Sequence, residues 1–222
     1  MVKVGINGFG RIGRLILRAL LENYKGKIQV VGINDLGSIE TNAHLIKYDS
    51  THGILNQNVQ STSDGFKIGD QNIKVFAERD PAKLPWGNIG VDVVLECTGF
   101  FLDKTSAGKH IQAGAKKVII SAPAKEVDFT LVQGVNSKEL KKNHNVISNG
   151  SCTTNCLAPV AMVLEKTFGI TYGYMTTIHS YTGDQKLLDT LHKDLRRARQ
   201  TEGSMIPTST GAAKAMSLVL PS

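Results

Sequence analysis

Cys152 is the residue of this chain best suited to chemistry. It lies in the run 148–156 (SNGSCTTNC), among small and hydroxyl-bearing residues, and an apolar stretch compatible with a helix follows over 157–168. A thiol attacks only as its thiolate, and a free pKa of about 8.5 leaves little thiolate at neutral pH. The opening turn of a helix favours an anion and could also hold an oxyanion formed on a substrate carbonyl. This context predicts a nucleophile at Cys152, and the alternative is an ordinary buried cysteine.

His179 is the candidate partner of this thiol. Residues 173–178 (GYMTTI) have the pattern of a β-strand, which would place His179 at its edge. A histidine there could form an ion pair with the Cys152 thiolate and act as a general acid or base. The alternative is a structural histidine, because spacing along the chain does not show which side chains meet in space. The other histidines lie in helical or polar loop contexts with nothing nearby to recruit them: His44, His52, His110, His144 and His192.

A glycine loop near the N-terminus has the pattern of a dinucleotide site. Residues 2–7 alternate like a short strand, and the run 8–13 (GFGRIG) opens an amphipathic helix. Gly8 permits the tight turn, Gly10 lets the backbone approach a pyrophosphate, and Gly13 allows the helix to pack closely on the strand. The N-terminus of that helix attracts phosphates.

Asp35 indicates which dinucleotide binds. A second strand over 28–33 ends at Asn34 and Asp35, and the carboxylate lies about 20 residues after the glycine loop, where a ribose-binding residue belongs. Such a carboxylate accepts hydrogen bonds from both ribose hydroxyls and repels a 2′-phosphate, so NAD is favoured over NADP. The alternative for Asp35 is a turn residue that ends a strand.

The elements that position these residues alternate between strands and helices. We expect further strands over 73–76, 91–97, 117–120, 129–132 and 145–148, and helices over 39–47 and 105–113. This alternation predicts a mostly parallel, doubly wound sheet, whose ligands gather at the C-terminal ends of the strands. Thr98, Gly99 and Ser121 therefore join the candidates for the cofactor cleft. Arg79 could face the adenine side or be a solvated surface residue.

The composition is typical of a globular protein with a core of its own. The 222 residues are 41% apolar, and no apolar run is long enough to span a membrane, so we expect a cytoplasmic location. The three cysteines provide neither a disulfide framework nor a metal site, and we expect Cys97 and Cys156 to lie in the core. The net charge is +7, but the basic side chains are scattered and cluster only at 195–199. Nucleic acid is therefore not expected as the primary partner.

Four runs of residues together resemble the phosphorylating, NAD-dependent glyceraldehyde-3-phosphate dehydrogenase family along the whole chain. The runs are 5–14 (GINGFGRIGR), 151–159 (SCTTNCLAP), 179–182 (HSYT) and 207–215 (PTSTGAAKA). The resemblance implies that Cys152 attacks the aldehyde of glyceraldehyde 3-phosphate, that a hydride passes to NAD, and that inorganic phosphate releases 1,3-bisphosphoglycerate from a thioester. It implies that His179 is the base.

The resemblance also implies roles for residues that the patterns alone do not assign. It places Thr182 in the substrate-phosphate site and makes Arg197 a further anion contact. For the attacking phosphate it implies Ser151, Thr153, Thr210 and Gly211. For the cofactor it picks out Arg11, Ile12, Asp35, Arg79 and Ser121.

These observations predict an α/β protein in two parts. Residues 1–149 would form a Rossmann-type NAD-binding domain, and residues 150–222 would form the first part of an α+β catalytic domain. The family continues past Ser222 through more strands and a long helix, and a full-length relative is implied to be a homotetramer. We therefore expect weak or no turnover from residues 1–222 alone.

Two other functions compete with this interpretation. Erythrose-4-phosphate dehydrogenase is a relative with the same nucleophile and base, although 181–182 and 208–211 favour the glyceraldehyde enzyme. A noncatalytic fragment that binds NAD is the alternative from another class. Two smaller departures from the family are Gly150, in place of the usual alanine, which should loosen the turn before Cys152 slightly, and 190–191 (TL), in place of a common Ala-Pro pair.

Overall fold

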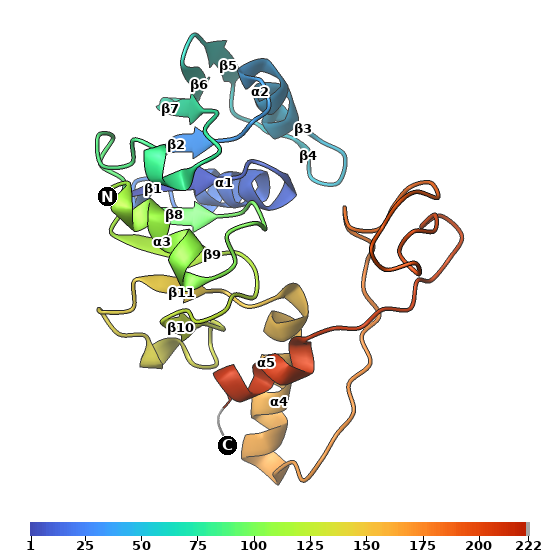
Figure 1. Ribbon diagram of the computed structural model, residues 1–222. Helices are drawn as coiled ribbons and strands as arrows, with labels where there is room; N and C mark the ends of the chain where they lie inside the picture. The colour runs from blue at the N-terminus through green and yellow to red at the C-terminus, as the bar shows by residue number, and fades with distance from the viewer. Residues whose placement is uncertain (221–222) are drawn as a thin grey trace. The chain divides into compact units, whose positions relative to one another are not determined.

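The computed structural model describes residues 1–220, so the last two residues of the expected second part lie outside it. It divides into two compact units, Met1–Ser151 and Cys152–Ser222. The first unit contains all the strands of the main sheet, and the second contains two helices joined by a long connection (Figure 1).

The first unit is built on one nine-stranded sheet with the order β10-β11-β9-β8-β1-β2-β7-β6-β5. Its strands from β10 to β7 pair in parallel, whereas β6 pairs antiparallel with both β7 and β5. The parallel strands are β1 (Val2–Asn7), β2 (Ile28–Asn34), β7 (Gln71–Phe76), β8 (Val93–Glu96), β9 (Lys117–Ile120), β10 (Phe129–Thr130) and β11 (Val146–Ser148). The antiparallel strands are β5 (Val59–Thr62) and β6 (Gly65–Ile68), and a separate ribbon joins β3 (Tyr48–Asp49) to β4 (Gly53–Ile54).

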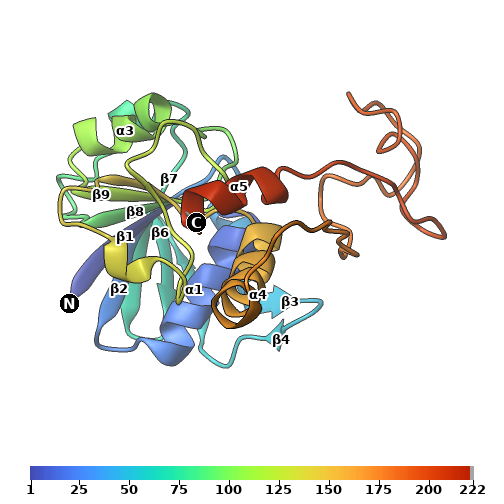
Figure 2. The same cartoon turned by 90° about the horizontal axis from the view of Figure 1, so that it is seen from below.

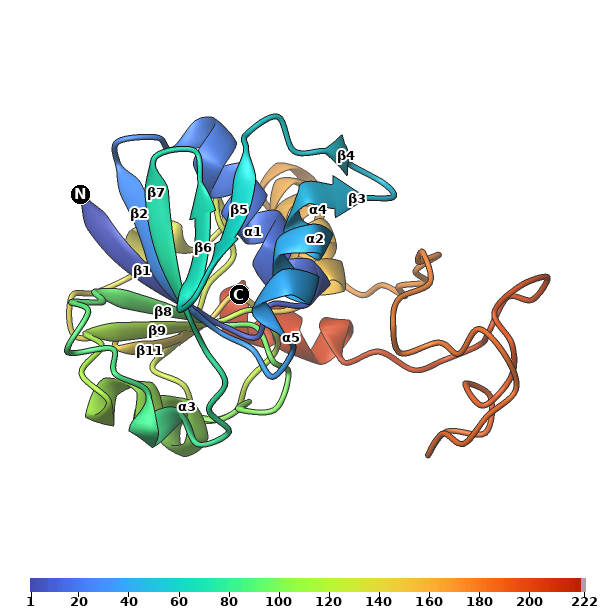
Figure 3. The same cartoon turned by 90° about the horizontal axis from the view of Figure 1, so that it is seen from above.

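Helices cover both faces of this sheet. α1 (Arg11–Asn23) and α2 (Ile39–Lys47) lie on one face and α3 (Lys104–Gln112) lies on the other, as Figure 3 shows; Figure 2 shows α1 and α3 from the opposite side. α2 and α3 begin at side-chain caps, because Ser38 Oγ accepts the N–H of Thr41 at 3.1 Å and Asp103 Oδ1 accepts the N–H of Ser106 at 2.8 Å. The doubly wound α/β class predicted for this part is confirmed.

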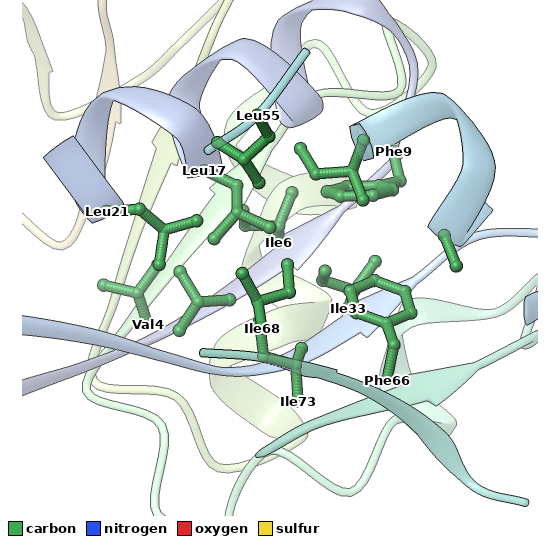
Figure 4. Packing of buried hydrophobic residues seen from close by; sticks show 13 residues of the cluster. Val4, Ile6, Phe9, Leu17, Leu21, Ile33, Leu55, Phe66, Ile68 and Ile73 are labelled. Atoms are coloured by element: carbon green, nitrogen blue, oxygen red, sulfur yellow. The ribbon is translucent and has the colours of Figure 1, made fainter. Parts of the chain in front are cut away.

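Two hydrophobic clusters hold the sheet between its helices. The cluster under α1 and α2 is drawn in Figure 4, where Leu17 and Leu21 of α1 point onto the sheet. Phe9 and Phe66 meet in this cluster with ring centroids 5.9 Å apart, and both side chains are buried. The cluster under α3 is centred on Trp86, which is completely buried. Because each face has its own buried cluster, the strand ends between them are held from both sides.

The sequence patterns located most elements of the first unit. The strand expected over 117–120 and the helix expected over 39–47 have the observed bounds, and the strands expected over 91–97, 129–132 and 145–148 are shorter than predicted. The hairpin of β5 and β6 was not predicted, although residues 64–65 (DG) before the alternating run 65–68 are a hairpin signal.

The second unit contains α4 (Cys152–Phe168) and α5 (Ala212–Val219), which contact each other. The helix expected after Cys152 is confirmed, and it runs through Pro159 without ending there. The strand expected over 173–178 is wrong, because these residues are extended without ladder pairing and most are exposed. A strand needs a neighbour for its backbone N–H and C=O groups, and in the part of the chain that the structure describes, residues 173–178 pair with none.

Among residues 1–220, the helices lack the combination of length and apolar character that a membrane span requires.

Gly13 should be a stability determinant of the first unit. A Cβ on Gly13 would lie 2.2 Å from the carbonyl oxygen of Gly8, so Gly13→Ala must displace the helix from the strand. We expect a loss of about 1–3 kcal/mol in the free energy of unfolding, measured by urea denaturation. Gly10→Ala is the matched control, because nothing lies within 4 Å of its added Cβ, and it should cost less than about 1 kcal/mol. Equal stability of Gly13→Ala and the parent chain would contradict this packing argument.

Candidate active site

A cleft of about 520 Å³ lies in the first unit at the C-terminal ends of β1, β2 and β8. Ligands of parallel α/β sheets bind at this edge, and the volume lies in the range of small-molecule sites. The residues that line the cleft are Asn7, Gly8, Gly10, Asn34, Asp35, Leu36, Glu78, Arg79, Cys97, Thr98, Phe100 and Phe101. Among the predicted cofactor residues, this group includes Gly8, Gly10, Asn34, Asp35 and Arg79.

The glycine loop leaves room for a phosphate group at the start of α1. Gly8 has φ +90°, and a Cβ there would lie 2.7 Å from the backbone nitrogen of Thr98. A Cβ added to Gly10 would meet no heavy atom within 4 Å, so the space beside this residue is open. Gly10 is also the N-cap of α1 and provides no side-chain cap for the first-turn N–H groups. An unfilled space in front of such donors fits the pyrophosphate of a dinucleotide.

Asp35 connects the end of β2 to the glycine loop. Its Oδ2 accepts the N–H of Phe9 at 2.8 Å and its Oδ1 accepts the N–H of Gly37 at 2.8 Å. The carboxylate is also in the lining of the cleft. Asp35 therefore holds the loop in place and also lines the cleft. A residue that orders the turn after β2 can, in this position, also be available to a ribose.

The other predicted cofactor residues lie near the cleft without lining it. Arg11 and Ile12 form the first turn of α1, where Ile12 is half exposed and Arg11 forms an ion pair with Asp49 of the β3–β4 ribbon. Gly13 packs against Gly8. Ser121 follows β9, and its side chain hydrogen bonds to the thiol of Cys97.

Sequence reasoning missed several residues of the cleft. Asn7, Glu78, Phe100 and Phe101 line it, and the available signal was that Asn7 ends a strand and that the others lie in the loops that follow strands. Cys97, which was expected in the core, is partly buried, packs against the core cluster under α1 and α2, and also lines the cleft. Burial raises the pKa of the Cys97 thiol to about 11 against the opposing hydrogen bond from Ser121, so this cysteine is a poor nucleophile.

The second unit brings Cys152 and His179 together. Cys152 is the first residue of α4, and its Sγ lies 3.1 Å from His179 Nε2. The other ring nitrogen, Nδ1, donates to the carbonyl oxygen of Ser180 at 2.6 Å, which orients the imidazole. Both side chains are exposed. The thiol, the base and a group that orients the base therefore form the arrangement of an activated nucleophile.

The electrostatics of this pair favour the thiolate. Burial raises the pKa of the Cys152 thiol, but hydrogen bonds from His179 and from the backbone N–H of Thr153 outweigh it and lower that pKa below its ordinary value. The carbonyl oxygen of Ser180 and the Cys152 sulfur raise the pKa of His179. The lowered pKa of Cys152 and the raised pKa of His179 both favour the thiolate and imidazolium forms of the pair.

Two of the predicted phosphate residues meet around Asp184. Arg197 Nη1 donates to Asp184 Oδ2, and the N–H of Asp184 donates to Thr182 Oγ1 at 3.3 Å. Arg197 also donates to the hydroxyl of Thr208. His192 Nε2 lies 3.3 Å from Asp184 Oδ1, so the expectation that nothing recruits this histidine is wrong. The Arg197 guanidinium is therefore already paired with a carboxylate, Asp184, in this structure.

The remaining phosphate candidates lie at the starts of the two helices. Ser151 and Thr153 flank Cys152, while Gly211 is the N-cap of α5 and Thr210 Oγ1 accepts the N–H of Ala212 at 3.2 Å. Hydroxyl and backbone N–H groups at a helix start are suitable partners for an anion.

One expectation near the thiol is wrong. Cys156 was expected in the core, but it is exposed, because α4 turns that side chain away from its buried residues Thr154 and Ala158. Gly150, in the turn before Cys152, has φ 63°, the left-handed conformation that glycine adopts without strain. In residues 1–220, no three His, Cys, Asp or Glu side chains are grouped as a metal ion would require.

Comparisons with known proteins match both parts of the chain. Residues 2–104 match the family model described as glyceraldehyde 3-phosphate dehydrogenase, NAD binding domain, and residues 151–222 match its C-terminal domain. A glyceraldehyde-3-phosphate dehydrogenase of Xanthobacter flavus is 59% identical over 220 residues, which are 99% of this chain and 66% of the relative. A Bacillus cereus relative, glyceraldehyde-3-phosphate dehydrogenase 1, is 58% identical over 222 residues (100% and 66%), and a Geobacillus stearothermophilus relative is 59% identical over 221 residues (99% and 65%). The chain thus spans about two thirds of the length of these relatives.

The reactivity of Cys152 should depend on His179. In His179→Asn, the Cys152 pKa should rise toward its ordinary value, because the imidazolium that stabilises the thiolate is gone. Alkylation of Cys152 by iodoacetamide at pH 6 to 7 should then slow by about tenfold for each unit by which the pKa rises. Mass spectrometry locates the adduct among the three cysteines, and His192→Asn is the control, since His192 pairs with Asp184. Unchanged alkylation across the pH range in His179→Asn would rule out the pair.

Proposed function

The chain belongs to the glyceraldehyde-3-phosphate dehydrogenase family, and from this membership we propose that the whole protein oxidises and phosphorylates glyceraldehyde 3-phosphate to 1,3-bisphosphoglycerate with NAD. The observation that carries the proposal is the Cys152 thiol 3.1 Å from His179 at the start of α4. The names of the relatives support this substrate over erythrose 4-phosphate, and they support an enzyme over a noncatalytic NAD-binding fragment.

The first step uses the thiolate and the base. Cys152 attacks the aldehyde carbon, the C=O π bond breaks, and its oxygen takes a proton, which gives a thiohemiacetal. His179 then removes the proton of that hydroxyl while the hydrogen on carbon leaves with its electron pair, and the product is a thioester. NAD, when bound, supplies the acceptor for that hydride. The N–H groups of the first turn of α4 stabilise the oxyanion that forms on the way.

The second step releases the acyl group to phosphate. An oxygen of inorganic phosphate attacks the thioester carbon, the C–S bond breaks, and the Cys152 thiolate is restored. We assign the attacking phosphate to Ser151, Thr153, Thr210 and Gly211. We assign the phosphate of the substrate to Thr182, with Arg197 as a further anion contact. The supporting observations are the helix starts and the hydroxyl, N–H and guanidinium donors described above.

NAD fits the cleft of the first unit. The open space at Gly10 and the first turn of α1 suit the pyrophosphate, and Asp35 suits the ribose hydroxyls. Arg11, Ile12, Arg79 and Ser121 are assigned with them as cofactor residues, as are Gly8, Gly13 and Asn34.

The assembly, the location and the domain boundary complete the proposal. We propose a homotetramer at full length, with residues 1–149 as the nucleotide domain and 150–222 as the first part of the catalytic domain. We propose a cytoplasmic location with no nucleic acid or membrane as primary partner. Three free cysteines suit a reducing compartment.

Activity should require the complete chain, phosphate and Cys152. A chain carried to the full length of its relatives should form NADH from glyceraldehyde 3-phosphate in a phosphate-dependent way, whereas residues 1–222 alone should show weak or no turnover. Cys152→Ser should lower turnover of the complete chain by more than about a thousandfold, while Cys156→Ser serves as the matched control. Absorbance of NADH measures both. Full activity of the Cys152→Ser variant would contradict the proposal. A complete, folded parent chain without phosphate-dependent activity would contradict it as well.

The preference for NAD should depend on the charge of Asp35. Asp35→Asn removes the repulsion of a 2′-phosphate and keeps one acceptor oxygen, so the ratio of NADP to NAD affinity should rise by about tenfold or more. Isothermal titration calorimetry with both dinucleotides gives the ratio. Asp70→Asn removes the same charge from an exposed turn between β6 and β7 and should leave the ratio unchanged. An unchanged ratio in Asp35→Asn would reject the ribose role.

A further inference from the structure

Glu96 is a buried carboxylate at the end of β8 that receives four hydrogen bonds. Its side chain is 1% exposed. Oε1 accepts the N–H of Thr98 at 2.7 Å and the hydroxyl of Thr98. Oε2 accepts Asn7 Nδ2 at 2.6 Å and lies 2.9 Å from His110 Nε2. Four donors fill the capacity of an ionised carboxylate, which offsets the cost of burying its charge.

One chain of donors reaches Glu96 from the core under α3. Trp86 Nε1 donates to His110 Nδ1 at 3.0 Å, and an indole nitrogen can only donate. His110 Nδ1 is therefore the acceptor, and the ring proton is on Nε2, which faces Glu96. His110 is 0% exposed, and this geometry makes it a neutral donor to the carboxylate. The expectation that nothing recruits this histidine is therefore wrong.

A second chain reaches Glu96 from the loop after β7. The N–H of Glu78 donates to Asn34 Oδ1 at 2.8 Å, Asn34 Nδ2 donates to Asn7 Oδ1 at 2.7 Å, and Asn7 Nδ2 donates to Glu96. The backbone N–H at one end and the carboxylate at the other set the orientation of both amides, since a flipped amide would bring two donors together.

A third chain is short and lies at the cleft itself. The N–H of Phe100 donates to Thr98 Oγ1 at 3.1 Å, and the Thr98 hydroxyl donates to Glu96. The second and third chains contain Asn7, Asn34, Glu78, Thr98 and Phe100, all of which line the cleft. Each of the three chains ends at this one carboxylate, and Asn34 Nδ2 also donates to the carbonyl oxygen of Glu78 at 2.8 Å.

We propose that Glu96 is the positioning residue of the cofactor cleft, and that it orders the cleft-lining side chains by accepting these three chains. The inference rests on the proposed use of NAD at this cleft. Glu96 itself does not line the cleft, so it acts through Thr98, Asn7 and Asn34. Because His110 and Trp86 belong to the same network, two core residues that lie outside the lining contribute to its order.

Glutamine at position 96 is a sharp test, because it has nearly the same shape. In one orientation its NH2 group would face the N–H of Thr98, while the Thr98 hydroxyl can turn to accept from it; in the other orientation it would face two donors, Asn7 and His110. The other tautomer of His110 gives no relief, since it would place an N–H against the N–H of Trp86. Glu96→Gln therefore breaks at least one hydrogen bond next to the cleft.

NAD binding to the 222-residue chain, measured by calorimetry, tests the proposal. Glu96→Gln should weaken binding by about tenfold or more in a protein that thermal unfolding shows to be folded. Glu22→Gln removes the same charge from the exposed side of α1 and should bind like the parent chain. The chain has one tryptophan, so its indole N–H gives a single NMR signal, and Glu96→Gln should shift it through His110.

A matched pair at His110 covers the case in which Glu96→Gln does not fold. His110→Leu removes both the donor to Glu96 and the acceptor for Trp86, and it should weaken NAD binding although residue 110 is outside the cleft. His110→Gln keeps one donor and one acceptor on a side chain of similar volume, and it should restore most of the affinity. A role in packing alone would affect both variants alike.

The outcomes separate this inference from the proposed function. A parent chain that fails to bind NAD would overturn the cofactor assignment itself. A parent chain that binds NAD, with Glu96→Gln or His110→Leu folded and equal to it in affinity, would overturn only the role of Glu96. Equal loss of affinity in His110→Leu and His110→Gln would also overturn it.

Discussion

The close approach of the glycine loop to the strand ends is the constraint on which the nucleotide cleft depends. Gly8 lies so near Thr98, and Gly13 so near Gly8, that a Cβ at either position would overlap a backbone atom. This contact brings the start of α1 over the end of β1, while Asp35 holds the loop through the N–H of Phe9. The first-turn N–H groups, the carboxylate and the cleft can face one ligand only because no side chain separates them.

The two functional regions stabilise charge in different ways. Glu96 is an anion kept in a low-dielectric interior by four fixed donors, and it is costly to disturb because every donor would lose its partner. Cys152 and His179 are exposed and lie 3.1 Å apart, and in the proposed reaction this pair would exchange protons. A buried network suits a residue that positions others, whereas an accessible pair suits groups that react with an aldehyde.

The sequence predicted what local patterns determine. Glycine spacing located the loop, hydrophobic periodicity located most parallel strands and their helices, and the position of Asp35 after β2 placed it in the cleft. It did not predict contacts between side chains far apart in the chain, such as Trp86 with His110 and His110 with Glu96. The strand expected over 173–178 was wrong for a related reason, because a strand pattern specifies a backbone preference but supplies no partner to pair with.

Three anions of the proposed reaction would lie at the start of a helix that follows a small residue. Gly10 precedes α1 at the proposed pyrophosphate position, Ser151 precedes Cys152 at α4, and Gly211 precedes α5 at the proposed position of the attacking phosphate. A long side chain at any of these three positions would occupy the space in front of the first turn of its helix. Small residues there keep the donors open to ligands, and they explain why runs such as GFGRIG and SCTTNC carry so much of the chemistry of this chain.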